Sequence, residues 1–181
     1  MRKKYVGTNG NQQAGVTLIE LLVVLSLVAI LAVMAAPSWK RYSEKQKIRG
    51  VSAALISDLN LLRSEAIQRN KTVTVHFSTG TAWCYGLSED PAQSCNCTSA
   101  PQTCTIDGLA RLTTAEDFKQ VQLFSTTFTD GKTGFEPTRG MALNQGSLLL
   151  QSSSGYSVTI TLNPVGRITV CANDSTLFPS C

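Results

Sequence analysis

Histidine is nearly absent from this chain, which has one, His76, in 181 residues. No Ser–His–acid or Cys–His arrangement for nucleophilic catalysis can be assembled around it. His76 falls on the polar face of a predicted strand, so we interpret it as a surface or hydrogen-bonded residue. The sequence therefore predicts a protein that is not an enzyme and that needs no cofactor.

Cysteine is missing from the first 83 residues, although the chain contains six. An even number of cysteines, all beyond the apolar run described below, indicates an oxidising compartment and disulfide bonds. The Cys-Asn-Cys spacing at residues 95–97 does not match structural zinc sites, so we predict no metal. The six residues are Cys84, Cys95, Cys97, Cys104, Cys171 and Cys181.

Charged side chains are missing between Glu20 and Lys40. This gap holds an apolar run, residues 21–36, in which only Ser26 is polar, and its hydroxyl can bond back onto its own helix. As a helix, residues 16–36 would span roughly 31 Å. That length matches the hydrocarbon core of a bilayer, about 30 Å, so we predict a segment that enters the membrane.

Three basic residues, Arg2, Lys3 and Lys4, precede the apolar run. Such clusters stay cytoplasmic, which predicts a single pass through the inner membrane with the N-terminus inside and the head in the periplasm. These residues also supply three of the four net positive charges. Without residues 1–15 the chain has 13 basic and 12 acidic side chains, so its basic pI is poor evidence for a nucleic-acid surface.

Glu20 is the one residue that does not fit a plain membrane anchor, because a carboxylate at the start of an apolar helix is costly. Two interpretations remain open. Glu20 lies close enough to the interface to stay hydrated, or it has a positive partner from elsewhere. If the chain were cut after Gly15, the new amine of Val16 would supply such a charge, and packed copies of the chain could satisfy every pair.

Beyond the apolar run, the sequence predicts a long helix followed by short strands. Five apolar residues recur at spacings of 4, 4, 3 and 4, which is one helical stripe for core packing. We predict one helix over residues 16–69, with weak points at Pro37 and Gly50. The stripe consists of Val51, Leu55, Leu59, Leu62 and Ala66.

The remaining residues predict an α+β architecture, in which short antiparallel strands follow the helix. Alternation at residues 72–77 predicts the first strand, with a return strand at residues 82–87 and a loop at 88–107. Residues 144–146 and 152–155 are typical of hairpin turns. Further strands are predicted at residues 121–125, 141–143, 147–151, 156–162 and 167–171.

The N-terminal residues resemble a known signal. Gly15, then Val-Thr-Leu-Ile-Glu, then the apolar helix is similar to the class III signal of type IV prepilins and type II secretion pseudopilins. The resemblance implies that prepilin peptidase cuts after Gly15 and methylates Val16. It implies that Glu20 pairs with the N-terminus of a neighbouring subunit during fibre assembly. Partners would be inner-membrane lipid, other major and minor pilins, and the inner-membrane assembly platform.

Three later segments resemble the GspH/FimT branch of minor pilins and pseudopilins: residues 62–75 with Trp83, residues 134–140, and residues 163–167. The resemblance implies a type IV pilin-like fold, a long helix on a sandwich-like antiparallel β head. It implies a FimT/FimU-like minor pilin that primes assembly or sits at the fibre tip. The domains would be a leader (1–15), a membrane or fibre-core segment (16–37) and a head (38–181). The head would combine an amphipathic helix (about 38–69) with a β domain (about 72–181).

Disulfide pairing follows partly from this resemblance. Cys171 and Cys181 resemble the pair that closes the C-terminal loop of many pilins. Because a Cys95–Cys97 bond is disfavoured on geometry, Cys84 would pair with Cys95 or Cys97, and Cys104 with the other.

Two alternative functions remain open. One is a minor pseudopilin of a type II secretion system. The other is a DNA-binding minor pilin for natural transformation, because some FimT-like proteins bind DNA through a C-terminal Gly-Arg-x-Arg motif. Here Gly166-Arg167 is followed by Ile168 and Thr169, so the second arginine is missing. Arg139 and Lys132 are further DNA-binding candidates.

Overall fold

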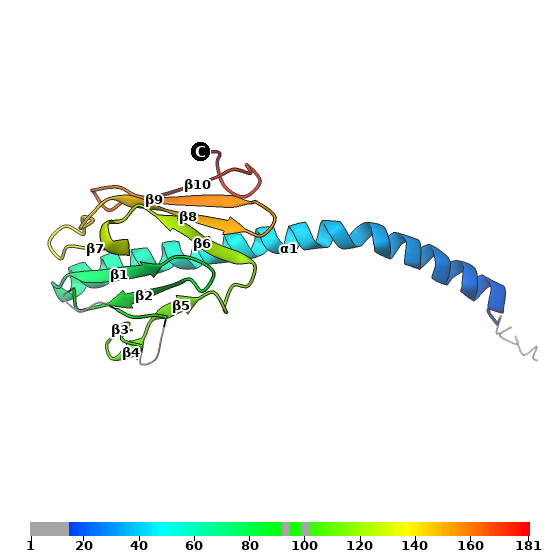
Figure 1. Cartoon of the computed structure of the whole chain (residues 1–181), viewed down its shortest axis with the longest axis horizontal. Helices are drawn as coiled ribbons and strands as arrows, with labels where there is room; N and C mark the ends of the chain where they lie inside the picture. The colour runs from blue at the N-terminus through cyan, green and yellow to red at the C-terminus, as the bar shows by residue number, and fades with distance from the viewer. Residues whose placement is uncertain (1–14, 92–94, 99–101) are drawn as a thin grey trace, which may run out of the picture. The chain divides into compact units, whose positions relative to one another are not determined.

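The computed structural model describes residues 15–91, 95–98 and 102–181, without the side chains of residues 34–37. It forms one long helix, α1 (Leu18–Arg69), followed by short antiparallel strands (Figure 1). The predicted α+β class is therefore confirmed. The chain divides into two compact units, one ending at Trp39 and one covering Lys40–Cys181, which we call the head.

Local capping explains where α1 begins and ends. The hydroxyl of Thr17 accepts the Glu20 N–H at 3.3 Å, which makes Thr17 the N-cap, so the helix begins two residues later than predicted. At the other end, Asn70 adopts a left-handed conformation with φ of 52°. The Lys71 N–H bonds to the Ala66 carbonyl and the Asn70 N–H to that of Ile67, a Schellman motif that stops the helix.

The predicted apolar stripe of α1 is confirmed as the centre of the head's core. All five of its residues are at most 1% exposed, and Ile48 extends the stripe by one turn. They pack in one cluster with side chains of both large sheets, such as Val75, Leu123 and Ile160. Figure 1 shows the second half of α1 running alongside both sheets.

The first sheet has the order β5-β2-β1-β7, with every pairing antiparallel. A separate two-stranded ribbon, β3 with β4, turns at Asp107 and Gly108, whose φ values of 54° and 71° match a two-residue hairpin turn. The strands are β1 (Val73–Ser78), β2 (Cys84–Ser88), β3 (Thr105–Ile106), β4 (Leu109–Ala110), β5 (Leu112–Thr114) and β7 (Lys132–Phe135).

The second sheet has the order β10-β9-β8-β6, also antiparallel, and a short 3-10 turn, η1 (Thr129–Gly131), follows β6. Buried Trp83 donates its indole N–H to the Val121 carbonyl at 2.7 Å, and Gly80 N–H bonds to the Leu123 carbonyl. These bonds join β6 to the first sheet. The strands are β6 (Val121–Thr126), β8 (Gly146–Ser152), β9 (Ser157–Leu162) and β10 (Ile168–Ala172).

One strand prediction and one turn prediction were wrong. Residues 141–143 form no strand but one isolated bridge, Ala142 to Phe135, because their pairing with the end of β7 is limited to the two hydrogen bonds that flank this bridge. Consequently residues 144–146 are not a hairpin turn. The predicted loop 88–107 ends in β3, and β4, β5 and β7 were also missed. The turn at residues 152–155 is confirmed, since it joins β8 to β9.

Candidate functional site

The predicted cleavage bond between Gly15 and Val16 lies just before α1 rather than within it. Both residues are exposed and in no regular secondary structure, and Val16 is 70% exposed. Their backbone is therefore not held by the hydrogen bonds of the helix. The basic leader residues Arg2, Lys3 and Lys4 lie outside the described residues.

Glu20 occupies the first turn of α1, where an acid favours the helix dipole. With Thr17 as N-cap, Glu20 completes a Thr-x-x-Glu sequence, the capping-box pattern. Sequence reasoning missed this second explanation for an acid at position 20, although the spacing signals it. Within the part of the chain that the structure describes, Glu20 makes no ion pair, and its predicted partner belongs to another copy of the chain.

The first half of α1 exposes apolar side chains on all sides. Every large apolar residue of Leu18–Val33 is between 51% and 77% exposed. Ser26 donates its hydroxyl to the Val23 carbonyl at 2.7 Å, so it adds no unpaired polar group to this surface. No single described helix is by itself long and apolar enough to cross a membrane, but Leu18–Val33 and Ser38–Arg69 meet those criteria together as a bent pair.

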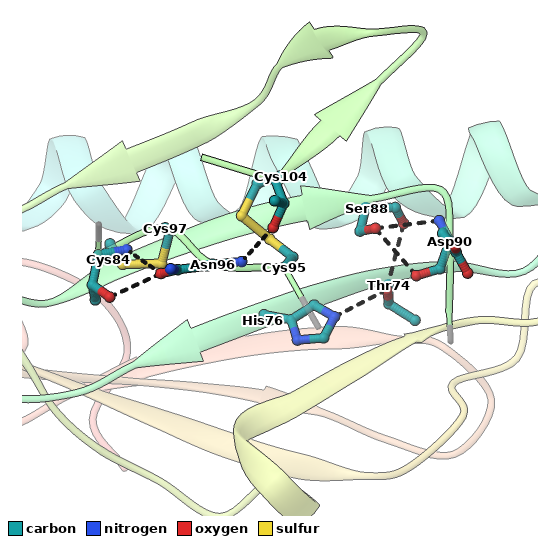
Figure 2. The surroundings of a disulfide bond; sticks show 11 residues. Thr74, His76, Cys84, Ser88, Asp90, Cys95, Asn96, Cys97 and Cys104 are labelled. Atoms are coloured by element: carbon teal, nitrogen blue, oxygen red, sulfur yellow. Dashed lines mark hydrogen bonds between the residues drawn. A yellow bond between two sulfur atoms is a disulfide. The ribbon is translucent and has the colours of Figure 1, made fainter. Parts of the chain in front are cut away.

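Three disulfides lie in the head. Cys171 bonds to Cys181, and of the two arrangements left open by the sequence, the structure forms Cys84–Cys97 and Cys95–Cys104 (Figure 2). These four cysteines form their own buried cluster. A Cβ added at Gly86 would lie 2.3 Å from the Cys104 sulfur, so the cluster requires glycine at that point of β2.

The last residue of α1 binds the disulfide-rich region to the helix. Arg69 pairs bidentately with Asp107 at the β3–β4 turn, pairs with Glu65 one turn back, and lies 3.7 Å from Glu89. The Arg69 guanidinium lowers the pKa of Asp107. This network fixes the ribbon at the end of the helix.

At the start of the head, α1 is held by polar contacts from two segments. The carboxylate of Glu44 is fully buried and accepts the Ser154 N–H at 2.9 Å from the β8–β9 turn. Burial raises the pKa of Glu44, but the polar groups of Ser152, Ser153 and Ser154 outweigh it and keep the pKa below its usual value. The Glu44 Oε1 atom has no hydrogen-bond partner among the described residues. Glu44 is therefore held as a buried anion.

The C-terminal loop closed by Cys171–Cys181 makes the second set of contacts. Lys45 forms an ion pair with Asp174 at 2.7 Å, and the Arg49 guanidinium donates to the Thr176 carbonyl at 2.7 Å. Leu177 inserts its side chain into the core, where it is 6% exposed. The loop between Cys171 and Cys181 therefore contacts α1 as well as continuing from the end of β10.

Tyr85 and His76 have structural partners inside the head. Tyr85 donates its hydroxyl to the Asp58 carboxylate at 2.8 Å, and burial raises the pKa values of both groups. His76 is half-buried, lies 3.3 Å from the Thr74 hydroxyl (Figure 2), and has a pKa lowered by burial and by Lys132. Among the described residues, no group of three or more His, Cys, Asp or Glu side chains could hold a metal.

The structure brings together two of the three DNA-binding candidates. Arg139 and Arg167 are exposed beside Gly140 and Gly166, and a Cβ on Gly166 would lie 2.4 Å from the Gly140 carbonyl, so the two turns abut. Arg63 of α1 reaches behind them to the Gly166 carbonyl, at 3.4 Å. Lys132 begins β7, opposite His76 in the first sheet, and does not join these turns.

Comparison with known proteins gives two matches. The family model described as type II transport protein GspH matches residues 52–166, which is more than half of the chain. The model of the prokaryotic N-terminal methylation motif matches residues 10–36, a range that includes Gly15, Val16 and Glu20. No solved structure matches the chain.

Proposed function

Because the chain belongs to the GspH family of type II transport proteins, within the type IV pilin and pseudopilin superfamily, we propose that it is a FimT/FimU-like minor pilin. In this role it primes fibre assembly or sits in the tip complex. The families are structural, and their N-terminal motif marks a membrane-anchored helix of the prepilin type. The chain would be made in the inner membrane with its head in the periplasm and then enter the fibre.

The observation that carries this proposal is the exposed apolar surface of Leu18–Val33. A single soluble chain does not leave twelve large apolar side chains more than half exposed on one helix. Lipid covers such a surface in the membrane, and helices of other subunits cover it in a fibre. The head, by contrast, already has its own core, so it needs no partner to fold around the helix.

We propose the following sequence of events. The peptidase cuts after Gly15 and methylates Val16, and the apolar helix then moves from lipid into the fibre centre. There Glu20 accepts the positive charge of a neighbour's N-terminus. In an apolar interior neither charge is stable alone, so pairing selects the correct axial position of each subunit.

The test is designed to separate charge pairing from helix capping. The Glu20 backbone N–H donates to the Thr17 hydroxyl, and every residue at position 20 keeps that bond. Gln also keeps a side-chain oxygen that can accept the Thr17 N–H in a capping box but removes the charge, whereas Ala removes both the oxygen and the charge. We expect Glu20→Gln and Glu20→Ala to insert normally and to enter purified fibres about tenfold less than the wild type, or lower still. Ser26→Ala, which removes the other polar group of the segment, is the matched control and should assemble normally.

If Glu20→Gln assembles like the wild type while Glu20→Ala does not, Glu20 serves as a cap and the pairing proposal is wrong. If both variants assemble normally, position 20 has no role in assembly. Membrane levels of each variant, measured in the same cells, separate failed assembly from failed insertion.

A role as a type II secretion pseudopilin is the second candidate, and membership of a family of type II transport proteins favours it. The same processing and packing would operate, but in a short periplasmic fibre. Deleting the gene for this chain separates the two. Loss of twitching with normal secretion supports the pilin role, and loss of secretion with normal twitching supports the pseudopilin role.

DNA binding is a third candidate, favoured by the abutting turns that carry Arg139 and Arg167. Two arginines neutralise at most two phosphates, so a plot of log affinity against log salt should have a slope of only about −2. A gel shift with the full chain, compared with an Arg139→Gln/Arg167→Gln double variant, tests this. No shift, or an equal shift by both proteins, would eliminate this surface as a DNA receptor.

A further inference from the structure

An open, polar cavity of about 710 Å³ lies at the start of the head. Three segments form its walls: Arg41 on α1, residues 154–156 in the β8–β9 turn, and residues 173–175 after β10. Its size falls in the range of small-molecule sites, about 300–1,000 Å³. Hydroxyl and amide side chains make up most of the lining, so the cavity suits a polar group.

The uncompensated charge in this cavity is positive. Asp174 also lines it, but the carboxylate is paired with Lys45 at 2.7 Å and accepts the Thr176 hydroxyl at 2.6 Å. Those contacts hold the pKa of Asp174 at about 2, so the carboxylate is charged at neutral pH, with the Lys45 ammonium beside it. Arg41 makes no hydrogen bond or ion pair with any residue that the structure describes. A guanidinium on a polar wall matches the geometry of phosphate oxygens.

Chain length places this arginine close to the membrane surface. The match to the methylation motif ends at residue 36, and Arg41 follows five residues later. Five residues reach at most about 18 Å even when fully extended, so Arg41 stays near the headgroups whatever the angle between the two units. A phosphate supplied by a lipid headgroup is therefore the nearest ligand of the right charge.

The basic residues around Arg41 point to the same ligand. Five basic residues fall within the first ten residues of the head, next to the apolar segment. Three of the five are engaged: Lys45 with Asp174, Lys47 with Gln120 and Arg49 with the Thr176 carbonyl. Lys40 and Arg41 have no such partner among the described residues. An anionic lipid surface attracts cations in this position.

We propose that the cavity beside Arg41 binds the phosphate of an anionic phospholipid headgroup and thereby holds the head on the membrane before the subunit enters the fibre. Arg41 is the phosphate ligand, and the hydroxyls of Ser154 and Ser175, which also line the cavity, complete the site. This inference rests on the proposed periplasmic orientation of the head. Entry into the fibre replaces lipid with protein around the apolar helix, which removes the headgroup from the cavity.

The test uses the full chain in non-ionic detergent micelles, with thermal unfolding of the head as the readout. Added phosphatidylglycerol should raise the unfolding temperature, because a ligand that binds only the folded state stabilises it. Phosphatidylcholine, which has no net charge, should bind more weakly, and inorganic phosphate at equal concentration should have no effect. Arg41→Gln should lower the affinity for phosphatidylglycerol about tenfold.

Arg139→Gln is the matched control, because it removes the same charge from an exposed site beside the far end of α1. Equal binding by wild type and Arg41→Gln overturns the proposal. An equal loss in Arg139→Gln shows attraction by net charge alone, and equal stabilisation by inorganic phosphate shows an anion site without lipid selectivity; both also overturn it. The micelle assay does not depend on orientation, whereas labelling of the head from the cytoplasm would contradict only the proposed orientation.

Discussion

The two halves of α1 belong to one helix but relate to the rest of the chain in opposite ways. In the N-terminal segment, residues 15–33, large apolar side chains on every face of the helix are 51–77% exposed. In the head, the stripe from Ile48 to Ala66 is at most 1% exposed. The first half therefore has no large apolar side chain that its own chain buries, and the second has a stripe that is fully buried.

This difference shows which contacts stabilise each half of α1. The head half is amphipathic, so its burial is completed when the chain folds and contributes to folding free energy. The N-terminal segment is apolar all round, so its burial is completed only by lipid or by other subunits. Matched substitutions in the two halves should therefore give different results in the same folding assay.

The largest difference is expected for leucine truncation. Leu59→Ala creates a cavity in the core of the head and should lower its free energy of unfolding by about 2–5 kcal/mol. Leu25→Ala removes the same atoms from the N-terminal segment and should leave head unfolding unchanged. Chemical denaturation of the full chain in micelles measures both. Equal losses would contradict the division of the helix into a covered half and an uncovered half.

The next difference concerns added rather than removed volume. Gly86→Ala places a methyl group 2.3 Å from the Cys104 sulfur and 2.8 Å from that of Cys95. We expect a loss of about 1–3 kcal/mol from overpacking, with free thiols detectable by alkylation. Gly15→Ala meets nothing within 4 Å and should not affect the head. A fully oxidised, equally stable Gly86→Ala protein would show that the cluster is loosely packed.

Removing a carboxylate from each half should have different effects on how the stability of the head depends on pH. Glu44 has a lowered pKa in the folded head, so its contribution to stability is complete above its unfolded pKa of 4.5 and is lost as pH falls through the folded value. Glu44→Gln should therefore flatten the loss of head stability below pH 4.5. Glu20→Gln should leave that acid profile unchanged. The expectation fails if the two variants have the same pH profile.

The smallest difference is expected for two serines that bond back onto the helix. Ser52 donates its hydroxyl to the Ile48 carbonyl inside the core, and Ser26 donates to the Val23 carbonyl on the exposed segment. Ser52→Ala should change head stability by less than about 1 kcal/mol, because the carbonyl remains in the helix ladder. Ser26→Ala should change nothing measurable. A larger loss for Ser26→Ala would reverse the comparison.

The sequence predicts the helix and its stripe well because their physical signals are local. Spacings of three and four residues identify Val51 through Ala66, and Asn70 marks the end through its tolerance of left-handed φ. The short strands were missed for a different reason. Strands β4, β5 and β7 have two to four residues, too few for an alternation to show, and partners from distant parts of the chain determine their positions. The Asp107-Gly108 pair, at the end of the segment interpreted as a loop, is a hairpin signal that the sequence analysis did not use.

The candidate sites divide in the same way. Glu20 and the Gly15–Val16 bond are identified by a contiguous motif, so the sequence alone supplies them. The hydrogen bonds from Lys45 and Arg49 to the C-terminal loop join residues more than 120 positions apart. No local pattern predicts such contacts. For the same reason the sequence did not separate Arg139 and Arg167, whose turns abut, from Lys132, which lies in strand β7.

We propose that other subunits bury the apolar surface of the N-terminal segment after proteolysis. The most direct measurement is the intact mass and N-terminal residue of the chain taken from purified fibres under non-reducing conditions. We predict a chain that begins with N-methylated Val16 and carries three disulfides. A chain that still begins with Met1 and nevertheless assembles into working fibres would contradict the claim.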